Sequence, residues 1–232
     1  MKRIFDNSVF KLSVIYGYLL MMIIMILYAV PGIVDYNGQR DKKDRQISRN
    51  EYIMGGYLKD TKLFDLDGMY FPVAIDSNIS EELYYVDSYG YERTYGGDRT
   101  HEGCDIMTVD NVRGQYPVVA VCDGTIEQMG WLELGGYRIG LKSESGVYYY
   151  YAHLHSYEAG IEEGMEVYAG QVIGYVGDTG YSKVEGTTGN FDVHLHFGIY
   201  LYDKDDNEYT VNPYYMLKEL ENSVIKYGFK KQ

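Results

Sequence analysis

The chain has 232 residues, enough for one ordinary domain with extensions but too few for two comfortable domains. Its 28 Tyr and 27 Gly, against only 4 Pro, favour short strands joined by tight turns over a helical bundle. Residues 51–232 carry 13 basic and 30 acidic residues, a net charge of −17, and such an acidic surface argues against nucleic acid as a partner.

An uncharged apolar stretch dominates the N-terminal part of the chain. Residues 12–34 read LSVIYGYLLMMIIMILYAVPGIV, which is long enough to cross a hydrocarbon core of about 30 Å as a helix. We therefore predict a single-pass transmembrane anchor there, with a cytoplasmic segment at 1–11 and a polar linker and lead-in at 35–70. A signal peptide cleaved near Ala29 is the alternative. Basic residues flank both ends of the stretch, so their charge does not decide its orientation.

Apolar runs separated by Gly-rich or acidic turns follow from residue 69 onward. β-branched and aromatic residues dominate these runs, which is typical of antiparallel strands. The runs are MYFPVAI (69–75), YPVVAVCDGTIEQM (116–129), YRIGLKS (137–143), VYYYYAHL (147–154), QVIGYVG (171–177) and VHLHFGIYLY (193–202). A last segment, which follows Asn212 and Pro213, predicts a short C-terminal helix. The sequence thus predicts a mainly β domain over 71–220 and a tail at 221–232.

Two cysteines, Cys104 and Cys122, are too few for a disulfide scaffold, and their spacing matches no zinc-binding motif. They are either small buried apolar residues or the two halves of one disulfide between neighbouring strands. The sequence leaves both alternatives open.

All five histidines fall within the three short motifs HEGCD, YAHLHS and VHLHF, at positions 101, 153, 155, 194 and 196. Imidazole is the commonest zinc ligand, and two imidazoles with one carboxylate are a recurrent ligand set for catalytic zinc. Two histidines that are two residues apart in a strand share one face. His101 and Asp105 would lie about 13 Å apart on a straight strand, so the chain must bend between them, and Gly103 makes a bend cheap. Together the motifs predict a zinc site.

Five segments in order carry a family resemblance: HEGCDI (101–106), PVVAVCDGTI (117–126), YYAHLHS (150–156), GQVIGYVGDTG (170–180) and HLHFGIY (194–200). Together they resemble the lysostaphin-like (LytM-type) zinc endopeptidases, which cut the peptide part of bacterial peptidoglycan. The resemblance covers residues 71–220 and implies a compact antiparallel β domain with an active-site groove. Residues 181–193 depart from the family pattern, and the groove wall expected there would influence specificity.

Carried over by position, the resemblance implies that His101, Asp105 and His196 bind Zn²⁺. It also implies that His153 and His194 are catalytic, whereas His155 has no role in the pattern. The implied protein is a membrane-anchored zinc metalloendopeptidase at the cell membrane, acting on peptidoglycan peptides outside the cytoplasm. The alternative is a membrane-anchored scaffold or channel component that resembles sporulation factors, has little or no catalytic activity, and uses the same domain to dock a protein partner in the envelope.

Overall fold

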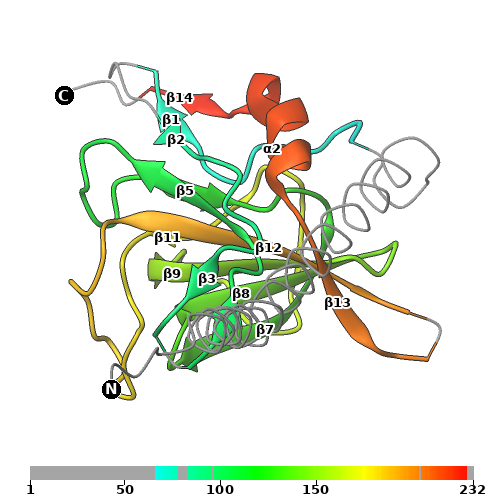
Figure 1. The fold of residues 1–232 in the computed structure, drawn as a ribbon. Coiled ribbons are helices and arrows are strands. Elements are labelled where there is room, and N and C mark those ends of the chain that lie inside the picture. The colour runs from blue at the N-terminus through cyan, green and yellow to red at the C-terminus, as the bar shows by residue number, and fades with distance from the viewer. Residues whose placement is uncertain (1–65, 78–82, 96, 204, 229–232) are drawn as a thin grey trace, which may run out of the picture. The chain divides into compact units, whose positions relative to one another are not determined.

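The computed structural model describes residues 66–77, 83–95, 97–203 and 205–228, which contain fourteen strands and one short α-helix (Figure 1). The strands are β1 Ile75–Asp76, β2 Leu83–Tyr84, β3 Glu92–Arg93, β4 Arg99–Thr100, β5 Cys104–Thr108, β6 Pro117–Val119, β7 Gly124–Leu132, β8 Gly136–Ser143, β9 Tyr148–Tyr157, β10 Glu166–Val167, β11 Val172–Val176, β12 His194–Tyr202, β13 Glu208–Val211 and β14 Lys226–Tyr227. The helix α2 spans Tyr214–Leu220 and is followed by a 3₁₀ turn at Glu221–Ser223. The prediction of a mainly β fold with one short C-terminal helix is confirmed.

Ten of the described strands form one antiparallel sheet. Its main path runs β10-β7-β8-β9-β12-β5-β2, while β11 pairs with β6 and β9, and β13 pairs with β12. Figure 1 shows β12 between β9 and β5, so residues from the C-terminal third of the chain lie beside two earlier strands. The central position of β12 brings the motif at residues 194–200 next to the motif that begins at residue 101.

The core lies against the sheet because side chains alternate along its long strands. In β8, for example, Ile139 and Leu141 are completely buried. In β9 and β12 the rings of Tyr149 and Phe197 stack with centroids 6.2 Å apart. Full burial of each such side chain contributes about 1.5–3 kcal/mol to stability. These three strands therefore form a rigid support for the residues on their other face.

The C-terminal helix packs on the same core. Met216, Leu217 and Leu220 of α2 are buried, at the i, i+1 and i+4 spacing of one helix face. Beyond the helix, β14 pairs with β1 in parallel, with Lys226 opposite Ile75. The C-terminal residues up to Tyr227 thus join the start of the described domain.

The prediction of a single-pass protein at the cell membrane is wrong by the evidence of the structure. No helix in the described part of the chain is long and apolar enough to span a membrane. The helix α2 has seven residues, about 10 Å at 1.5 Å per residue, against a hydrocarbon core of about 30 Å. The predicted anchor at 12–34 lies outside the described residues.

Both cysteines are free thiols. Cys104 is fully buried, and its thiol lies 3.4 Å from the carbonyl oxygen of Val86. Burial raises the pKa of each thiol to about 12, so neither is a reactive thiolate at neutral pH. The first of the two alternatives, small buried residues without a disulfide, is the one that the structure supports.

Candidate active site

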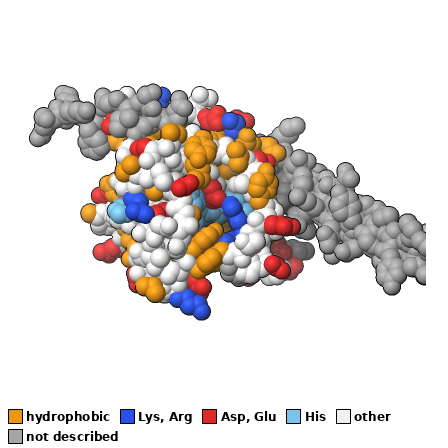
Figure 2. Space-filling model, turned by 60° about the vertical axis from the view of Figure 1, so that its left-hand side comes forward, with side chains coloured by type: hydrophobic (Ala, Val, Ile, Leu, Met, Phe, Trp, Pro, Cys, Tyr) orange, Lys and Arg blue, Asp and Glu red, His pale blue; other side chains and the backbone are white. Residues whose placement is uncertain are grey.

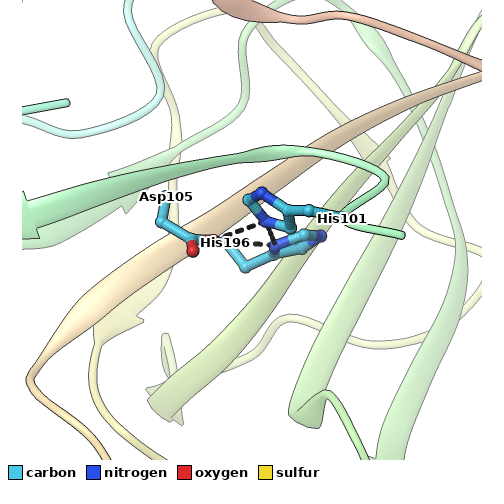
Figure 3. A group of neighbouring side chains, drawn as sticks. All are labelled: His101, Asp105 and His196. Atoms are coloured by element: carbon cyan, nitrogen blue, oxygen red, sulfur yellow. Dashed lines mark hydrogen bonds and ion pairs between the residues drawn. The ribbon is translucent and has the colours of Figure 1, made fainter. Parts of the chain in front are cut away.

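Three of the predicted site residues meet where β12 pairs with β5. His196 lies opposite Asp105 in the antiparallel register, and His101 reaches the same point from the segment just before β5 (Figure 3). The chain bends at Gly103, as predicted, which brings His101 Nε2 to 2.9 Å from Asp105 Oδ1. His196 Nδ1 lies 2.9 Å from each of these two atoms. One ligand atom from each residue therefore faces a common centre.

Hydrogen bonds around this centre fix the state of two of its members. His101 Nδ1 lies 3.0 Å from the carbonyl oxygen of Ser88, which only accepts, so the ring proton is on Nδ1 and Nε2 carries a lone pair. Arg93 donates to Asp105 Oδ2 at 2.6 Å and leaves Oδ1 for the centre. Burial opposes ionisation of Asp105, but the imidazoles of His101 and His196 hold its pKa well below 3.8. The carboxylate is therefore charged.

These atoms fit a metal ion. His101 Nε2 lies 2.9 Å from Asp105 Oδ1, and in the neutral Nδ1–H form of the ring no proton lies between these two atoms, so a cation would stabilise the arrangement. Tetrahedral zinc with bonds of about 2.0–2.1 Å would hold its ligands about 3.3 Å apart, close to the separations found here. Burial lowers the pKa of His196 below 6.5, and a neutral imidazole is the form that binds metal. The three residues are the group that could hold a metal among the described residues.

The two remaining predicted site residues lie beside this group. The ring of His153 is 4.8 Å from that of His194, and His194 Nε2 is 3.8 Å from Asp105 Oδ1. His153 Nδ1 donates to the carbonyl oxygen of Thr179 at 2.8 Å, and His194 Nδ1 donates to that of Asp192 at 2.7 Å. Since a carbonyl oxygen only accepts, both rings are protonated at Nδ1 and have a free Nε2.

A local irregularity of β9 directs His153 into the site. The pairing of β8 with β9 shifts between Tyr137 and Ile139, and His153 has a φ of 63°, in the left-handed region that non-glycine residues rarely occupy. Such a bulge turns a side chain out of the strand's alternation and is common beside active sites. The backbone N–H of His153 still donates to the carbonyl oxygen of Gly135 at 2.7 Å. Burial, together with the neighbouring imidazoles of His194 and His196, lowers the pKa of His153 well below 6.5.

The site opens into a groove of about 530 Å³ on the face of the sheet opposite the core. Figure 2 shows the hollow, in which histidine, basic and acidic side chains meet. Tyr181 and Phe191 line one side, with their rings 4.8 Å apart, and Tyr95 stacks on Tyr181 at 4.5 Å. Both Tyr181 and Phe191 come from the segment 181–193, which the sequence predicted to form a groove wall.

Sequence reasoning missed several contributors to the site. Arg93 and Ser88 come from the segment before His101, where no motif marks them, and Tyr95 stands in the same stretch. Their only sequence signal is closeness to the HEGCD motif. His155, which the resemblance left without a role, is exposed, lies against Gly114 and does not line the groove.

Comparisons with known proteins agree with this geometry. Residues 99–213 match the model of peptidase family M23. The chain is 38% identical over 168 residues to an L-Ala–D-Glu endopeptidase of Bacillus subtilis, covering 72% of this chain and 47% of that protein. It is 41% identical over 83 residues to lysostaphin of Staphylococcus simulans, covering 35% of this chain and 15% of that protein.

A LytM crystal structure from Ruminococcus gnavus superposes with a TM-score of 0.64 at 50% identity, covering 70% of this chain and 64% of that one. The chain thus spans about half the length of the Bacillus relative and a smaller part of lysostaphin. The motifs at residues 101–106 and 194–200 both lie within the matched region. The chain belongs to peptidase family M23, as a domain of the LytM type.

Proposed function

We propose that the protein is a zinc-dependent endopeptidase that hydrolyses peptide bonds in bacterial peptidoglycan. The observation that carries the proposal is the convergence of five polar side chains on one groove: a His-Asp-His group whose ligand atoms lie 2.9 Å apart, and two further imidazoles that bond backbone carbonyls through Nδ1.

His101, Asp105 and His196 would hold the zinc ion, leaving a position for water and substrate. Bound zinc supplies Lewis-acid activation of that water and of the scissile carbonyl group. Arg93 would keep the carboxylate of Asp105 oriented through Oδ2. The Ser88 carbonyl would do the same for His101 through its ring proton.

His153 and His194 would move protons. Because each ring donates its Nδ1 proton to a backbone carbonyl, each Nε2 is available to the substrate. One imidazole would accept a proton from the attacking water, and the other, once protonated, would donate a hydrogen bond to the carbonyl oxygen as negative charge develops there. Proton transfer of this kind contributes about 10²–10⁴-fold to a rate. The low pKa of His153 keeps its ring neutral, as a base requires.

The peptidoglycan substrate is inferred from the relatives. One is named an L-Ala–D-Glu endopeptidase, and another, from Staphylococcus capitis, is named a glycyl-glycine endopeptidase. An open groove lined with tyrosines suits an extended peptide better than a small enclosed ligand. The relatives differ in the bond that they are named for, so the family likeness alone does not select the bond.

The test uses the full chain purified with zinc, incubated with isolated peptidoglycan. Wild type should contain zinc and release peptides, and a chelator should stop the release. Asp105→Ala should lose both zinc and release, because it removes a proposed ligand, whereas His153→Ala should keep zinc and lose release. His155→Ala is the matched control for His153→Ala, since His155 lies on the same strand, β9, but outside the groove. It should behave as wild type. Full release by His153→Ala would refute the proposed role of that residue. Zinc binding without release by wild type would refute the endopeptidase.

A further inference from the structure

One arginine in the groove has no partner. Three arginines line it, and two are engaged: Arg93 binds Asp105, and Arg99 donates to the Tyr95 carbonyl and the Tyr181 hydroxyl. Arg138 differs, because its Nε and Nη1 are buried and make no hydrogen bond in the described structure. Leaving buried hydrogen-bond donors unmet costs about 1–3 kcal/mol each, and more for a charged group. An unpaired guanidinium in a groove therefore points to a ligand that is not part of the chain.

The fold sets the position of Arg138 relative to the catalytic centre. It lies on β8 between residues that pair with Leu154 and Tyr151, so it stands beside the bulge of β9. On the other side of β9, Ala152 pairs with His196. Two strand spacings, about 10 Å, thus separate the backbone of Arg138 from that of His196. That distance matches about three residues of an extended peptide, and the long side chain shortens it.

Two acidic side chains that line the groove with Arg138, those of Glu127 and Glu208, have other partners. Glu127 pairs with Lys142 at 3.0 Å, and Glu208 accepts a hydrogen bond from the Tyr202 hydroxyl at 2.7 Å. On the groove floor, Tyr148 has its pKa raised to about 12 by burial, with the positive charge of Arg138 opposing the rise. Arg138 therefore lines the groove beside Tyr148 and Tyr150 and has no carboxylate among the described residues as a partner.

We propose that Arg138 binds a free carboxylate of the substrate and so determines specificity for an acidic residue within about three residues of the cleaved bond. A guanidinium binds a carboxylate through two parallel hydrogen bonds, which fixes its orientation as well as its charge. The inference rests on the proposed peptidase function and narrows it. Glutamate has two carboxyl groups and needs only one to continue a peptide, so a D-Glu residue within a chain offers the second. A glycine bridge offers none.

The test compares two synthetic peptides that contain L-Ala–D-Glu and differ only in whether the second carboxyl of D-Glu is free or amidated. Wild type should cleave the free acid with a kcat/KM about 10- to 100-fold higher, the range for a charge-assisted hydrogen bond. Arg138→Met keeps the length of the side chain without the charge, and it should lose that preference by slowing only on the free acid. Lys226→Met is the control, because Lys226 is an exposed cation on β14 that does not line the groove, and it should retain the preference.

Zinc content and melting temperature should match wild type in both variants. Equal loss on both peptides in Arg138→Met would mean a merely structural role and would overturn the proposal, as would equal cleavage of the two peptides by wild type. If wild type cleaves neither peptide, release from isolated peptidoglycan tests the proposed peptidase function separately. The binding of the two peptides, measured by calorimetry, then decides the role of Arg138. If wild type binds the free acid more tightly than the amidated peptide and Arg138→Met does not, the role of Arg138 is supported. If wild type binds both peptides equally, the role is overturned.

Discussion

Position 103 has no room for a side chain larger than that of glycine. A Cβ atom at this position would lie 2.6 Å from His196 Cε1 and 2.6 Å from the carbonyl oxygen of Phe197. Ordinary contact begins near 3.4 Å, so Gly103→Ala requires a movement of about 0.8 Å. The Phe197 carbonyl belongs to the backbone of β12 and does not yield easily, since Phe197 pairs with Cys104. The start of β5 must move away from β12 to clear the carbonyl of Phe197, and this movement separates Asp105 from His196.

We expect Gly103→Ala to lower the free energy of unfolding by about 1–3 kcal/mol, the usual cost of overpacking. A misplacement near 1 Å costs about 10²-fold in rate, so kcat/KM on peptidoglycan peptides should fall by that order. Zinc affinity should fall about tenfold, since about 1.4 kcal/mol of the cost would fall on the ligand set. Chelator competition measures the affinity, and thermal unfolding measures the stability.

Gly124→Ala provides the matched control for this reasoning. Its Cβ would lie 2.5 Å from the backbone carbonyl of Lys142, a similar clash between neighbouring strands but away from the groove. It should lose stability and keep both zinc affinity and activity per folded molecule. If Gly103→Ala shows the same pattern as Gly124→Ala, the idea that Gly103 positions His196 is wrong.

Three further predictions concern the surroundings of the site. Arg93→Ala should weaken zinc binding about 10- to 100-fold by chelator competition without removing a ligand, because Asp105 loses the partner of its Oδ2. In the metal-free protein, the free energy of unfolding should fall as the pH drops from 7.5 to 5.5. His153 takes up a proton below about pH 6.5 in the unfolded chain, whereas in the folded protein its buried ring has a depressed pKa and stays neutral. The slope should be at most about 1.4 kcal/mol per pH unit for this group and smaller in His153→Ala, as measured by urea unfolding at each pH. Asp178→Ala removes the double hydrogen bond from Arg113 and should lower kcat/KM about tenfold with zinc retained, because the loop that holds the Thr179 carbonyl is released. An unchanged rate would mean that other contacts hold this loop.

The long strands could be predicted because their side chains alternate. The run 193–202 became β12, His194–Tyr202, and the run 171–177 became β11, Val172–Val176. The run 69–75 gave only the two-residue β1, since its backbone bonds irregularly: Tyr70 donates to Val121, and Pro72 has no N–H to donate. A two-residue strand has no period, so β2, β3 and β4 left no pattern in the sequence.

The meeting of His101, Asp105 and His196 could be predicted from the sequence for a different reason. Metal ligands are few in type, so the clustering of five histidines in three motifs was itself a signal. Arg93 gave no such signal, since arginines are common on surfaces and only the fold brings this one to Asp105. Arg138 lies inside a predicted strand, but the sequence does not reveal that its guanidinium lacks a partner.

The chemistry of His153 and His194 depends on atoms that no sequence motif records. Both rings are oriented by backbone carbonyls, of Thr179 and Asp192, and every residue has such a carbonyl. The path of the loop that joins these two acceptors therefore positions both rings. That path is fixed by Asp178, which is buried and also accepts a hydrogen bond from the Gly189 N–H at 2.7 Å. The ion pair of Asp178 with Arg113 thus links the shape of the groove wall to the proton state of the two imidazoles.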